Sequence, residues 1–391
     1  AMARAIDWLD KVGIPDPAER AKAYPFQFSG GMRQRVMIAM ALILHPRLII
    51  ADEPTTALDV TLQAQIFDLI LQMKAKDTSI LFITHDMGVI WELADRVLVM
   101  KDGRLIESGE VEPLFANPQE SYTRELLAAV PRLSDAPRAV EARSVEVEPI
   151  LKVNDLRTWF PVKSGVFART VDWVKAVDDV SIDVFPGECL GLVGESGSGK
   201  TTLGRSILGL ETPQKGEIFF EGQEIRGLGY HAMRPLRRHL QMIFQDPYSS
   251  LNSRLTVLEI LTEGLIEHGM LKGEKREVAA HWLEEVGLKA DTMNRYPHEF
   301  SGGQRQRICV ARAVALEPKF VVCDEAVSAL DVTIQAQVID LLMDLKDKLG
   351  LSYLFISHDL SVVKRICDRV VVMRHGKVVE AGKTIDLVER P

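Results

Sequence analysis

The sequence lacks an apolar run long enough to cross a bilayer, which takes about 20 residues in a helix. Its most apolar stretch, Val36–Leu44, is far shorter, so we expect any membrane role to be peripheral. Cysteine is scarce: the four cysteines form no Cys-x-x-Cys pair, which excludes the usual zinc and dithiol motifs. Three of the four lie in apolar runs and are predicted to be buried free thiols of a protein kept in a reducing compartment.

An excess of positive charge is missing as well. The formal net charge is −8, so no overall field favours nucleic acid. One local basic cluster, Arg234–His239, is predicted to be a solvated face rather than a binding patch. At 391 residues the chain is long enough for two or three domains with cores of their own.

The most informative feature that is present is the run Gly194-Glu-Ser-Gly-Ser-Gly-Lys200-Thr201, here called the phosphate loop. It fits the pattern G-x-x-x-x-G-K-[ST] and stands between an apolar run, Cys189–Val193, and a helix-like continuation. Glycines let backbone N–H groups close round a polyphosphate, while Lys200 supplies a positive charge and the Thr201 hydroxyl is placed to ligate Mg²⁺. A glycine-rich turn that binds nothing is the alternative, but the strand–loop–helix context favours a nucleoside triphosphate site.

The chain also repeats itself. Three motifs occur twice, the first two at an offset of 272 residues (300 minus 28) and the third one residue further apart: Phe28–Arg35 with Phe300–Arg307, Ala51–Val60 with Cys323–Val332, and Ile83–Asp86 with Ile356–Asp359. Two copies of one nucleotide-binding unit therefore lie in tandem.

The two copies are unequal in extent, because the first begins at a segment equivalent to His281–Gly287 and has no phosphate loop. We predict that residues 1–115 are the C-terminal part of a first domain, that residues 116–149 are a linker, and that residues 150–391 are a nearly complete second domain. The chain is then part of a longer tandem protein, and its Leu48–Ala51 strand is expected to lose sheet neighbours.

Short apolar runs alternate with segments of helical period, which predicts an α/β fold with a mainly parallel core sheet. The predicted buried strands include Leu48–Ala51, Ser79–Thr84, Phe320–Cys323 and Ser352–Ser357. Ligands of such sheets bind at the carboxyl ends of the strands, and the acidic and histidine motifs fall at those ends.

Four side chains at these strand ends are candidates for chemistry. Asp324 is predicted to hold Mg²⁺ beside Thr201, and Glu325 to polarise the water that attacks the γ-phosphate. His358 is predicted to contact the γ-phosphate and to hold the water and Glu325 in place, and Gln245 to reach Mg²⁺ or that water. Each alone would be an ordinary strand-end or loop residue; with the phosphate loop, the functional interpretation is favoured.

Ser301-Gly-Gly303 precedes a predicted helix, Gln304–Leu316. A serine and two glycines at a helix N-terminus form an anion site, although alone they would be interpreted as a simple helix cap.

Taken together, these motifs resemble the ATP-binding cassette (ABC) ATPases, in which they occur in this order. Within that family, Phe244–Arg254, Leu156–Lys163 and Tyr122–Leu127 are similar to the ATPases of dipeptide, oligopeptide and nickel importers, including the tandem-fused ones. The resemblance implies a P-loop NTPase fold with an antiparallel β subdomain and an α-helical signature subdomain. It also implies ATP and Mg²⁺ as cofactors, ATP hydrolysis, and pairing of two cassettes with ATP between the phosphate loop of one and the Ser-Gly-Gly signature of the other.

The resemblance further assigns roles to particular residues. Glu325 and His358, with Glu53 and His85 of the first copy, are implied to be catalytic, and Thr201, Gln245 and Asp324 to lie at the metal. Phe160 is implied to stack on adenine, with Trp159 or Trp173 as alternatives. The nucleotide-contacting residues implied by the resemblance are Ser29, Gly30, Gly31, Phe160, Gly194, Glu195, Ser196, Gly197, Ser198, Gly199, Lys200, Thr201, Thr202, Gln245, Ser301, Gly302, Gly303 and Gln304.

Integral-membrane permease subunits are the implied partners, with Tyr248–Leu255 as their contact, and a periplasmic or extracellular solute-binding protein acts indirectly. The implied location is peripheral, at the cytoplasmic face of the inner membrane, and no nucleic acid partner is expected. One alternative is a soluble cassette ATPase acting on the ribosome or nucleic acid, but its marks, a long charged insertion or zinc-type cysteine pairs, are absent from the sequence. The other is a protein that holds ATP without hydrolysing it, against which the Asp-Glu and His motifs argue. The sequence does not select the transported solute.

Overall fold

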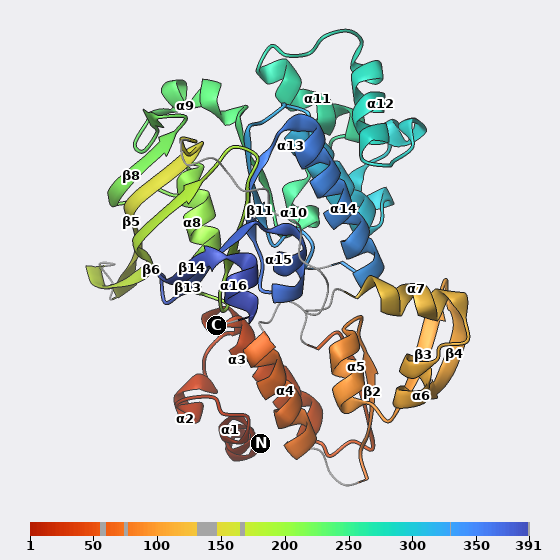
Figure 1. The fold of residues 1–391 in the computed structure, drawn as a ribbon. Coiled ribbons are helices and arrows are strands. Elements are labelled where there is room, and N and C mark those ends of the chain that lie inside the picture. The colour runs from red at the N-terminus through yellow and green to blue at the C-terminus, as the bar shows by residue number, and fades with distance from the viewer. Residues whose placement is uncertain (55–59, 74–76, 131–146, 165–168, 329, 390–391) are drawn as a thin grey trace. The chain divides into compact units, whose positions relative to one another are not determined.

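The computed structural model describes residues 1–54, 60–73, 77–130, 147–164, 169–328 and 330–389. These form two compact units, residues 1–128 and 129–391, which Figure 1 colours from red to orange and from yellow to blue. Each unit is described by itself.

The second unit is built round a six-stranded sheet. Its strands, in spatial order, are β10 (Leu240–Ile243), β11 (Phe320–Asp324), β12 (Ser352–Ile356), β7 (Cys189–Val193), β13 (Arg369–Arg374) and β14 (Lys377–Lys383). The first five are parallel, and only β14 is antiparallel to its neighbour. Every residue of β7, β11 and β12 is buried, which confirms the prediction of buried parallel strands in this unit.

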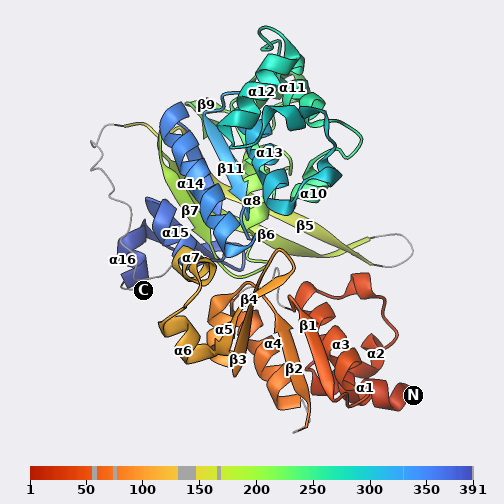
Figure 2. The same ribbon diagram turned by 90° about the vertical axis from the view of Figure 1, so that its right-hand side faces the viewer.

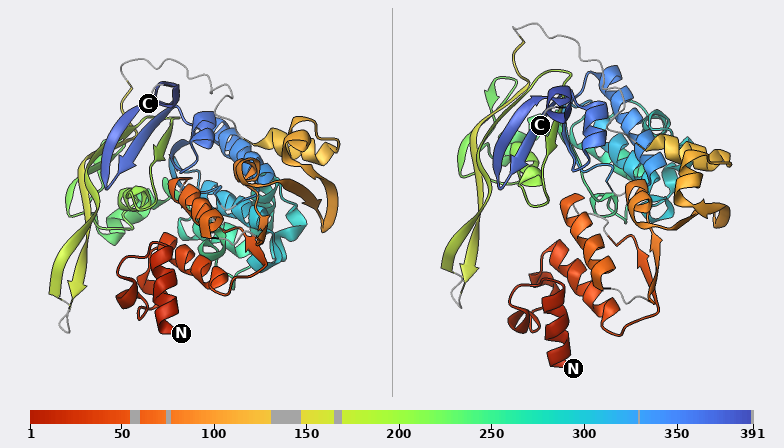
Figure 3. Two further views of the ribbon diagram at one scale, coloured as in Figure 1. Left: turned by 90° about the horizontal axis from the view of Figure 1, so that it is seen from below. Right: turned by 60° about the horizontal axis from the view of Figure 1, so that its bottom comes forward.

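A second, antiparallel sheet stands beside the first one. Its strands, in spatial order, are β6 (Arg169–Val184), β5 (Leu151–Ser164), β8 (Lys215–Phe220) and β9 (Gln223–Glu224). Figure 3 shows β5 and β6 as a long ribbon that extends away from the rest of the unit. This sheet is the antiparallel β subdomain that the family resemblance implies.

Helices complete the second unit. They are α8 (Lys200–Ile207), α9 (Tyr230–Arg237), α10 (Pro247–Ser250), α11 (Val257–Glu267), α12 (Lys275–Glu285), α13 (Gly302–Val314), α14 (Val332–Leu349), α15 (Leu360–Ile366) and α16 (Thr384–Glu389), with 3-10 turns at Ala290–Asn294 and Pro297–Glu299. Figure 2 shows α11 and α12 gathered at one end of the unit.

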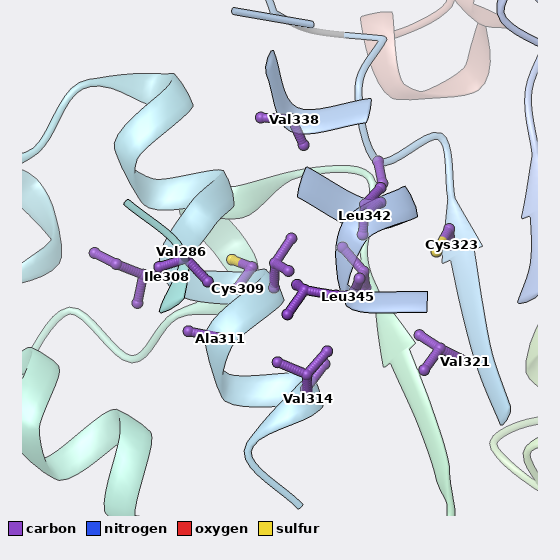
Figure 4. Packing of buried hydrophobic residues seen from close by; sticks show 14 of the residues in the cluster. Val286, Ile308, Cys309, Ala311, Val314, Val321, Cys323, Val338, Leu342 and Leu345 are labelled. Carbon is purple, nitrogen blue, oxygen red and sulfur yellow. The ribbon is translucent and has the colours of Figure 1, made fainter. Parts of the chain in front are cut away.

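Side chains of the parallel sheet alternate between two cores. From β11, Val321 and Cys323 face one core, which α11 to α14 cover (Figure 4). Phe320 and Val322 face the other, where Leu203 and Ile207 of α8 and the antiparallel sheet lie. A strand covered on both faces requires an unbroken apolar run, and the residues of β11 supply one.

The first unit reproduces part of this plan. Its elements are α1 (Met2–Lys11), α2 (Pro17–Arg20), a 3-10 turn at Pro25–Gln27, α3 (Gly30–Leu42), β1 (Leu48–Asp52), α4 (Val60–Met73), β2 (Ser79–Ile83), α5 (Met87–Leu93), β3 (Arg96–Lys101), β4 (Arg104–Glu110), α6 (Val111–Ala116) and α7 (Ser121–Ala129). Strands β1 and β2 are parallel, with Leu48 opposite Ser79. The equivalent pair in the second unit is Phe320 opposite Ser352.

The strands of the first unit form two separate pairs, β1–β2 and β3–β4, rather than one sheet. In the second unit β7 lies between β12 and β13 and bonds to both, and the described residues of the first unit contain no equivalent of β7. The prediction that Leu48–Ala51 and Ser79–Thr84 are buried strands is therefore wrong. Leu48 and Ile50 are 56% and 62% exposed, whereas their equivalents Phe320 and Val322 are 0% exposed.

One further prediction differs from the structure. The linker predicted for residues 116–149 contains α7, because the Glu107 carboxylate accepts hydrogen bonds from the backbone N–H groups of Gln119 and Glu120 and so holds the approach to that helix. The cluster Arg234–His239 agrees with the prediction of a solvated face, since Arg234 and Arg238 are exposed, and Arg234 Nη2 donates to the exposed Glu267 Oε1 at 2.6 Å. Residues of the cluster line a cavity of about 570 Å³ together with Glu221, Glu267 and His268.

The prediction of buried free thiols agrees with the structure. All four cysteines are buried and free. Within the described residues, no helix has both the length and the apolar character needed to span a membrane.

Candidate nucleotide site

The phosphate loop connects β7 to α8, as predicted, and its glycines are held tightly. Gly194 and Gly199 have φ of +152° and +103°. A Cβ at Gly194 would lie 2.2 Å from the carbonyl oxygen of Met373, and one at Gly199 would lie 1.9 Å from that of Ala176. The loop is thus clamped between β13 and β6. No sequence motif indicates that these two carbonyl groups lie against the phosphate loop.

Lys200 begins α8 and is only 5% exposed. Its Nζ donates to the carbonyl oxygens of Gly194 and Glu195 at 2.6 and 2.9 Å. The Lys200 ammonium group therefore lies within the phosphate loop at the N-terminus of α8, a position suited to binding phosphate oxygens. Thr202 follows in the same first turn.

Thr201 and Asp324 meet although 123 residues separate them. The Thr201 hydroxyl donates to Asp324 Oδ1 at 2.9 Å, and Asp324 is 1% exposed at the end of β11. Burial raises the pKa of Asp324, against the lowering effect of the Thr201 hydrogen bond and of Arg205 and Lys200. A hydroxyl and a carboxylate are the hard oxygen donors that Mg²⁺ prefers.

Gln245, Glu325 and His358 come together at the carboxyl ends of neighbouring strands. Gln245 Nε2 donates to Glu325 Oε2 at 2.7 Å, and His358 Nδ1 lies 3.7 Å from Glu325 Oε1. Glu325 has a φ of +46°, a left-handed conformation that costs about 1–3 kcal/mol in a residue other than glycine. Such strain, held by the hydrogen bond from Glu325 N to Ile356 O at 3.0 Å, is typical of functional sites.

The pairing of Glu325 with His358 shifts both pKa values. Burial raises the pKa of Glu325, but the contact with His358 and the positive charges of His358 and Lys200 outweigh it, so the pKa lies below its ordinary value. The contact with Glu325 raises the pKa of His358 and outweighs burial, which lowers it. The pair therefore favours a charged histidine beside a charged carboxylate.

We expect Glu325→Gln to lower the pKa of His358, because the variant removes the negative charge that stabilises the imidazolium. NMR titration of the His358 ring in the wild-type and variant proteins measures this directly. The raised pKa of His358 stabilises the fold below the ordinary histidine value of about 6.5, and this contribution is lost as the pH rises through the folded value. The lowered pKa of Glu325 acts in the opposite sense and its contribution is lost as the pH falls. An unchanged His358 titration would contradict the pairing.

The first unit repeats this strand-end geometry. His85 Nδ1 lies 3.1 Å from Glu53 Oε1, and Glu53 has a φ of +42°. Glu53 N donates to Ile83 O at 2.8 Å, as Glu325 N does to Ile356 O. Residues 55–59 of the repeated motif Ala51–Val60 lie outside the described residues.

The two Ser-Gly-Gly signatures, Ser29–Gly31 and Ser301–Gly303, both cap helices. The Ser301 hydroxyl accepts from Gln304 N at 3.4 Å and the Gln304 side chain accepts from Ser301 N at 3.1 Å; Ser29 accepts from Met32 N at 3.3 Å. A Cβ at Gly303 would lie 2.4 Å from Ile334 Cγ2, which explains that glycine by packing, and Gly31 is its equivalent. A Cβ at Gly302 or Gly30 would meet nothing within 4 Å, so the packing of the unit does not require those glycines.

The three aromatic candidates for adenine stacking lie on β5 and β6. Phe160 and Trp173 are 37% and 44% exposed. The Trp159 ring is covered by Lys175 Nζ at 4.9 Å. Phe160 and Trp173 therefore present rings to a ligand more readily than Trp159 does.

The strand–loop–helix at Gly194–Thr201, the Thr201–Asp324 contact and the Gln245–Glu325–His358 group together define a P-loop nucleotide hydrolase. Comparison with known proteins narrows this class. The sequence model of the ABC transporter family matches residues 1–56 and 177–328. The chain belongs to the ABC transporter family and is an ATP-binding, ATP-hydrolysing protein of that family, so the predicted resemblance, fold class and enzyme class are confirmed.

Relatives of this chain are transport proteins. Peptidoglycan transport ATP-binding protein YejF of Agrobacterium fabrum (strain C58) is 52% identical over 394 residues, covering 100% of this chain and 71% of that protein. Glutathione import ATP-binding protein GsiA of Escherichia coli (strain K12) is 51% identical over 414 residues, covering 100% of this chain and 66% of that protein. These names favour a transporter over an ATPase acting on the ribosome or nucleic acid.

Solved structures agree with this assignment. A dimeric post-hydrolysis state of the ATP-binding cassette MJ0796, bound to ADP and Pi, is similar with a TM-score of 0.53 and 27% identity. The match covers 60% of this chain and 98% of that one.

Proposed function

We propose that this chain is the ATP-hydrolysing part of an importer for peptides or related small solutes, and that it acts peripherally on integral-membrane permease subunits. The observation that carries the proposal is the convergence of Thr201 with Asp324, and of Gln245 and His358 with Glu325, beside the phosphate loop. The importer and its solute class come from the names of the relatives, of which this chain spans 71% and 66%.

In this proposal each residue of the group has one task. Lys200 and the backbone of the phosphate loop bind the outer phosphates, and Thr201, Asp324 and Gln245 hold Mg²⁺. When bound, Mg²⁺ neutralises charge on the phosphate oxygens. Glu325 accepts a proton from the attacking water, and His358 contacts both that carboxylate and the γ-phosphate and so holds them in position.

The signatures are proposed to close on a nucleotide held by a paired cassette. The open space at Gly30 and Gly302 supports this pairing. A side chain at either position would not clash with the rest of its own unit, but it would obstruct an approaching phosphate group. Ser29 and Ser301 would then serve as hydrogen-bond donors at a helix N-terminus. The contact with permease subunits is proposed at Tyr248–Leu255.

Mg²⁺-dependent ATP binding and turnover by the full 391-residue chain test the proposal. Lys200→Ala is expected to lower ATP affinity at least tenfold, because a buried charge-assisted contact is lost. Lys289→Ala, an exposed lysine away from the site, is the matched control and is expected to leave affinity unchanged. Ser29→Arg is expected to abolish turnover but not binding. Equal ATP affinity in the Lys200 variant and wild type would contradict the nucleotide site.

A further inference from the structure

Two residues join the loop that carries Gln245 to the helix that follows the signature. Tyr248 lies in α10, three residues after Gln245, and Arg305 lies in the first turn of α13, four residues after Ser301. The Arg305 guanidinium carbon stands 3.8 Å from the centroid of the Tyr248 ring. This is a cation–π contact, and a planar guanidinium can lie against a ring in a way that an ammonium group cannot.

The exposures of the two residues are opposite. Tyr248 is 66% exposed, whereas Arg305 is only 6% exposed. The ring therefore acts as a cover over a buried charge. Because most of the ring faces solvent, its removal would cost little core packing, and a large effect of that removal would have to come through Arg305.

Arg305 also holds the turn that leads into the signature. Its Nε donates to Pro297 O at 2.6 Å and its Nη2 to His298 O at 3.2 Å. These carbonyls belong to the 3-10 turn Pro297–Glu299, directly before Phe300 and Ser301. A displacement of Tyr248 would thus act on both sides of the signature.

The first turn of α13 has hydrogen-bonding capacity that is not used. Among the described residues, Arg305 Nη1 and Gln306 Nε2 are buried without a partner, and Gln306 is 1% exposed. In the first unit the equivalent Gln34 Nε2 does donate, to Pro54 O, just after Glu53. Buried polar groups without partners are costly, so a position of this turn in which these two groups found acceptors would be more favourable for them.

We propose that the Tyr248–Arg305 stack is a coupling element, and that Arg305 is a positioning residue which makes the signature turn follow the Gln245 loop. When Gln245 exchanges its hydrogen bond to Glu325 for a ligand at the site, α10 moves and the stack carries the start of α13 with it. This inference rests on the proposed function, because it takes the phosphate loop and the signature as the two nucleotide-contacting ends.

Hydrogen–deuterium exchange of the full chain, with and without Mg²⁺ and the non-hydrolysable analogue AMP-PNP, tests the coupling. In the wild type we expect the nucleotide to slow exchange at residues 194–201 and also at residues 302–306. Tyr248→Leu and Arg305→Lys are expected to keep nucleotide affinity within twofold and protection at 194–201. They are expected to lose at least four-fifths of the response at 302–306.

Matched variants separate coupling from a purely structural role. Tyr248→Phe keeps the ring and is expected to respond as the wild type does. Arg33→Lys changes the exposed equivalent of Arg305 in the first unit and is also expected to have no effect. Melting temperatures show whether each variant folds. If Arg305→Lys fails to fold, Tyr248→Leu still tests the coupling, because it changes an exposed side chain.

The outcomes are distinct. A response at 302–306 that persists in Tyr248→Leu would overturn the coupling, since direct contact of nucleotide with the signature does not need the ring. A wild type protected at 194–201 but not at 302–306 would overturn it as well. No protection at 194–201 in the wild type would contradict the proposed function itself and remove the coupling that rests on it.

Discussion

Replacing Glu325 with glutamine is expected to lower ATP turnover by at least about 100-fold while ATP stays bound, because a positioned general base contributes about that much or more. Glutamine keeps the shape of the side chain and can still accept the hydrogen bond from Gln245. It cannot accept a proton from water. Its neutrality also removes a negative charge near the phosphate loop, so ATP affinity is expected to equal or exceed that of the wild type.

Turnover measured under saturating Mg²⁺ and ATP, together with equilibrium nucleotide binding, checks this expectation. Glu317→Gln is the matched control: Glu317 also has a left-handed backbone, with a φ of +49°, but it is exposed and away from the site. If the strained backbone rather than the carboxylate were responsible, both variants would behave alike. Normal turnover by Glu325→Gln would refute the role given to Glu325.

Much of the site could be predicted from the sequence because its signals are local and the sheet rule connects them. The phosphate loop is one contiguous run, and Asp324, Glu325 and His358 each directly follow an apolar strand. In a parallel sheet those strand ends lie at one edge, so the sequence predicts that Thr201 and Asp324 lie close together, and a 2.9 Å hydrogen bond joins them. Helix caps at Ser29 and Ser301 are local as well.

What covers a strand could not be predicted from the strand itself. The run Leu48–Ala51 is as apolar and unbroken as Phe320–Cys323. Each run alone would suit a strand that is covered on both faces. The burial of the second depends on α8, β7 and the antiparallel sheet, which are distant in sequence. The described residues of the first unit hold no equivalents of these, and Leu48 and Ile50 are exposed as a result.

Contacts between residues of unrelated motifs, far apart in the sequence, could not be predicted either. The stack of Tyr248 on Arg305 joins two segments whose spacing follows no periodicity. The carboxylate of Glu107 accepts hydrogen bonds from backbone groups more than ten residues away, at the approach to α7, and nothing in the sequence of residues 116–149 indicates this contact. Such contacts depend on the turn geometry of the folded chain.

Replacing Gly199 with alanine is expected to remove ATP binding and to destabilise the second unit by more than about 2 kcal/mol, because two separate costs add. A φ of +103° is sparsely populated by residues with a Cβ and costs about 1–3 kcal/mol. The new Cβ would also stand 1.9 Å from the carbonyl oxygen of Ala176, so β6 or the loop has to move. Denaturant unfolding and equilibrium ATP binding measure the two effects.

Gly197→Ala separates the two costs, because Gly197 lies in the same loop with a φ of +78° but a Cβ there would meet nothing within 4 Å. It carries the backbone cost alone and is expected to destabilise less than Gly199→Ala. The difference between the two variants is then the cost of the clash with Ala176, and it reports how firmly β6 holds the phosphate loop. Equal losses of stability would mean that β6 yields without resistance, and the loop would then owe its shape to its own backbone rather than to the clamp between β6 and β13.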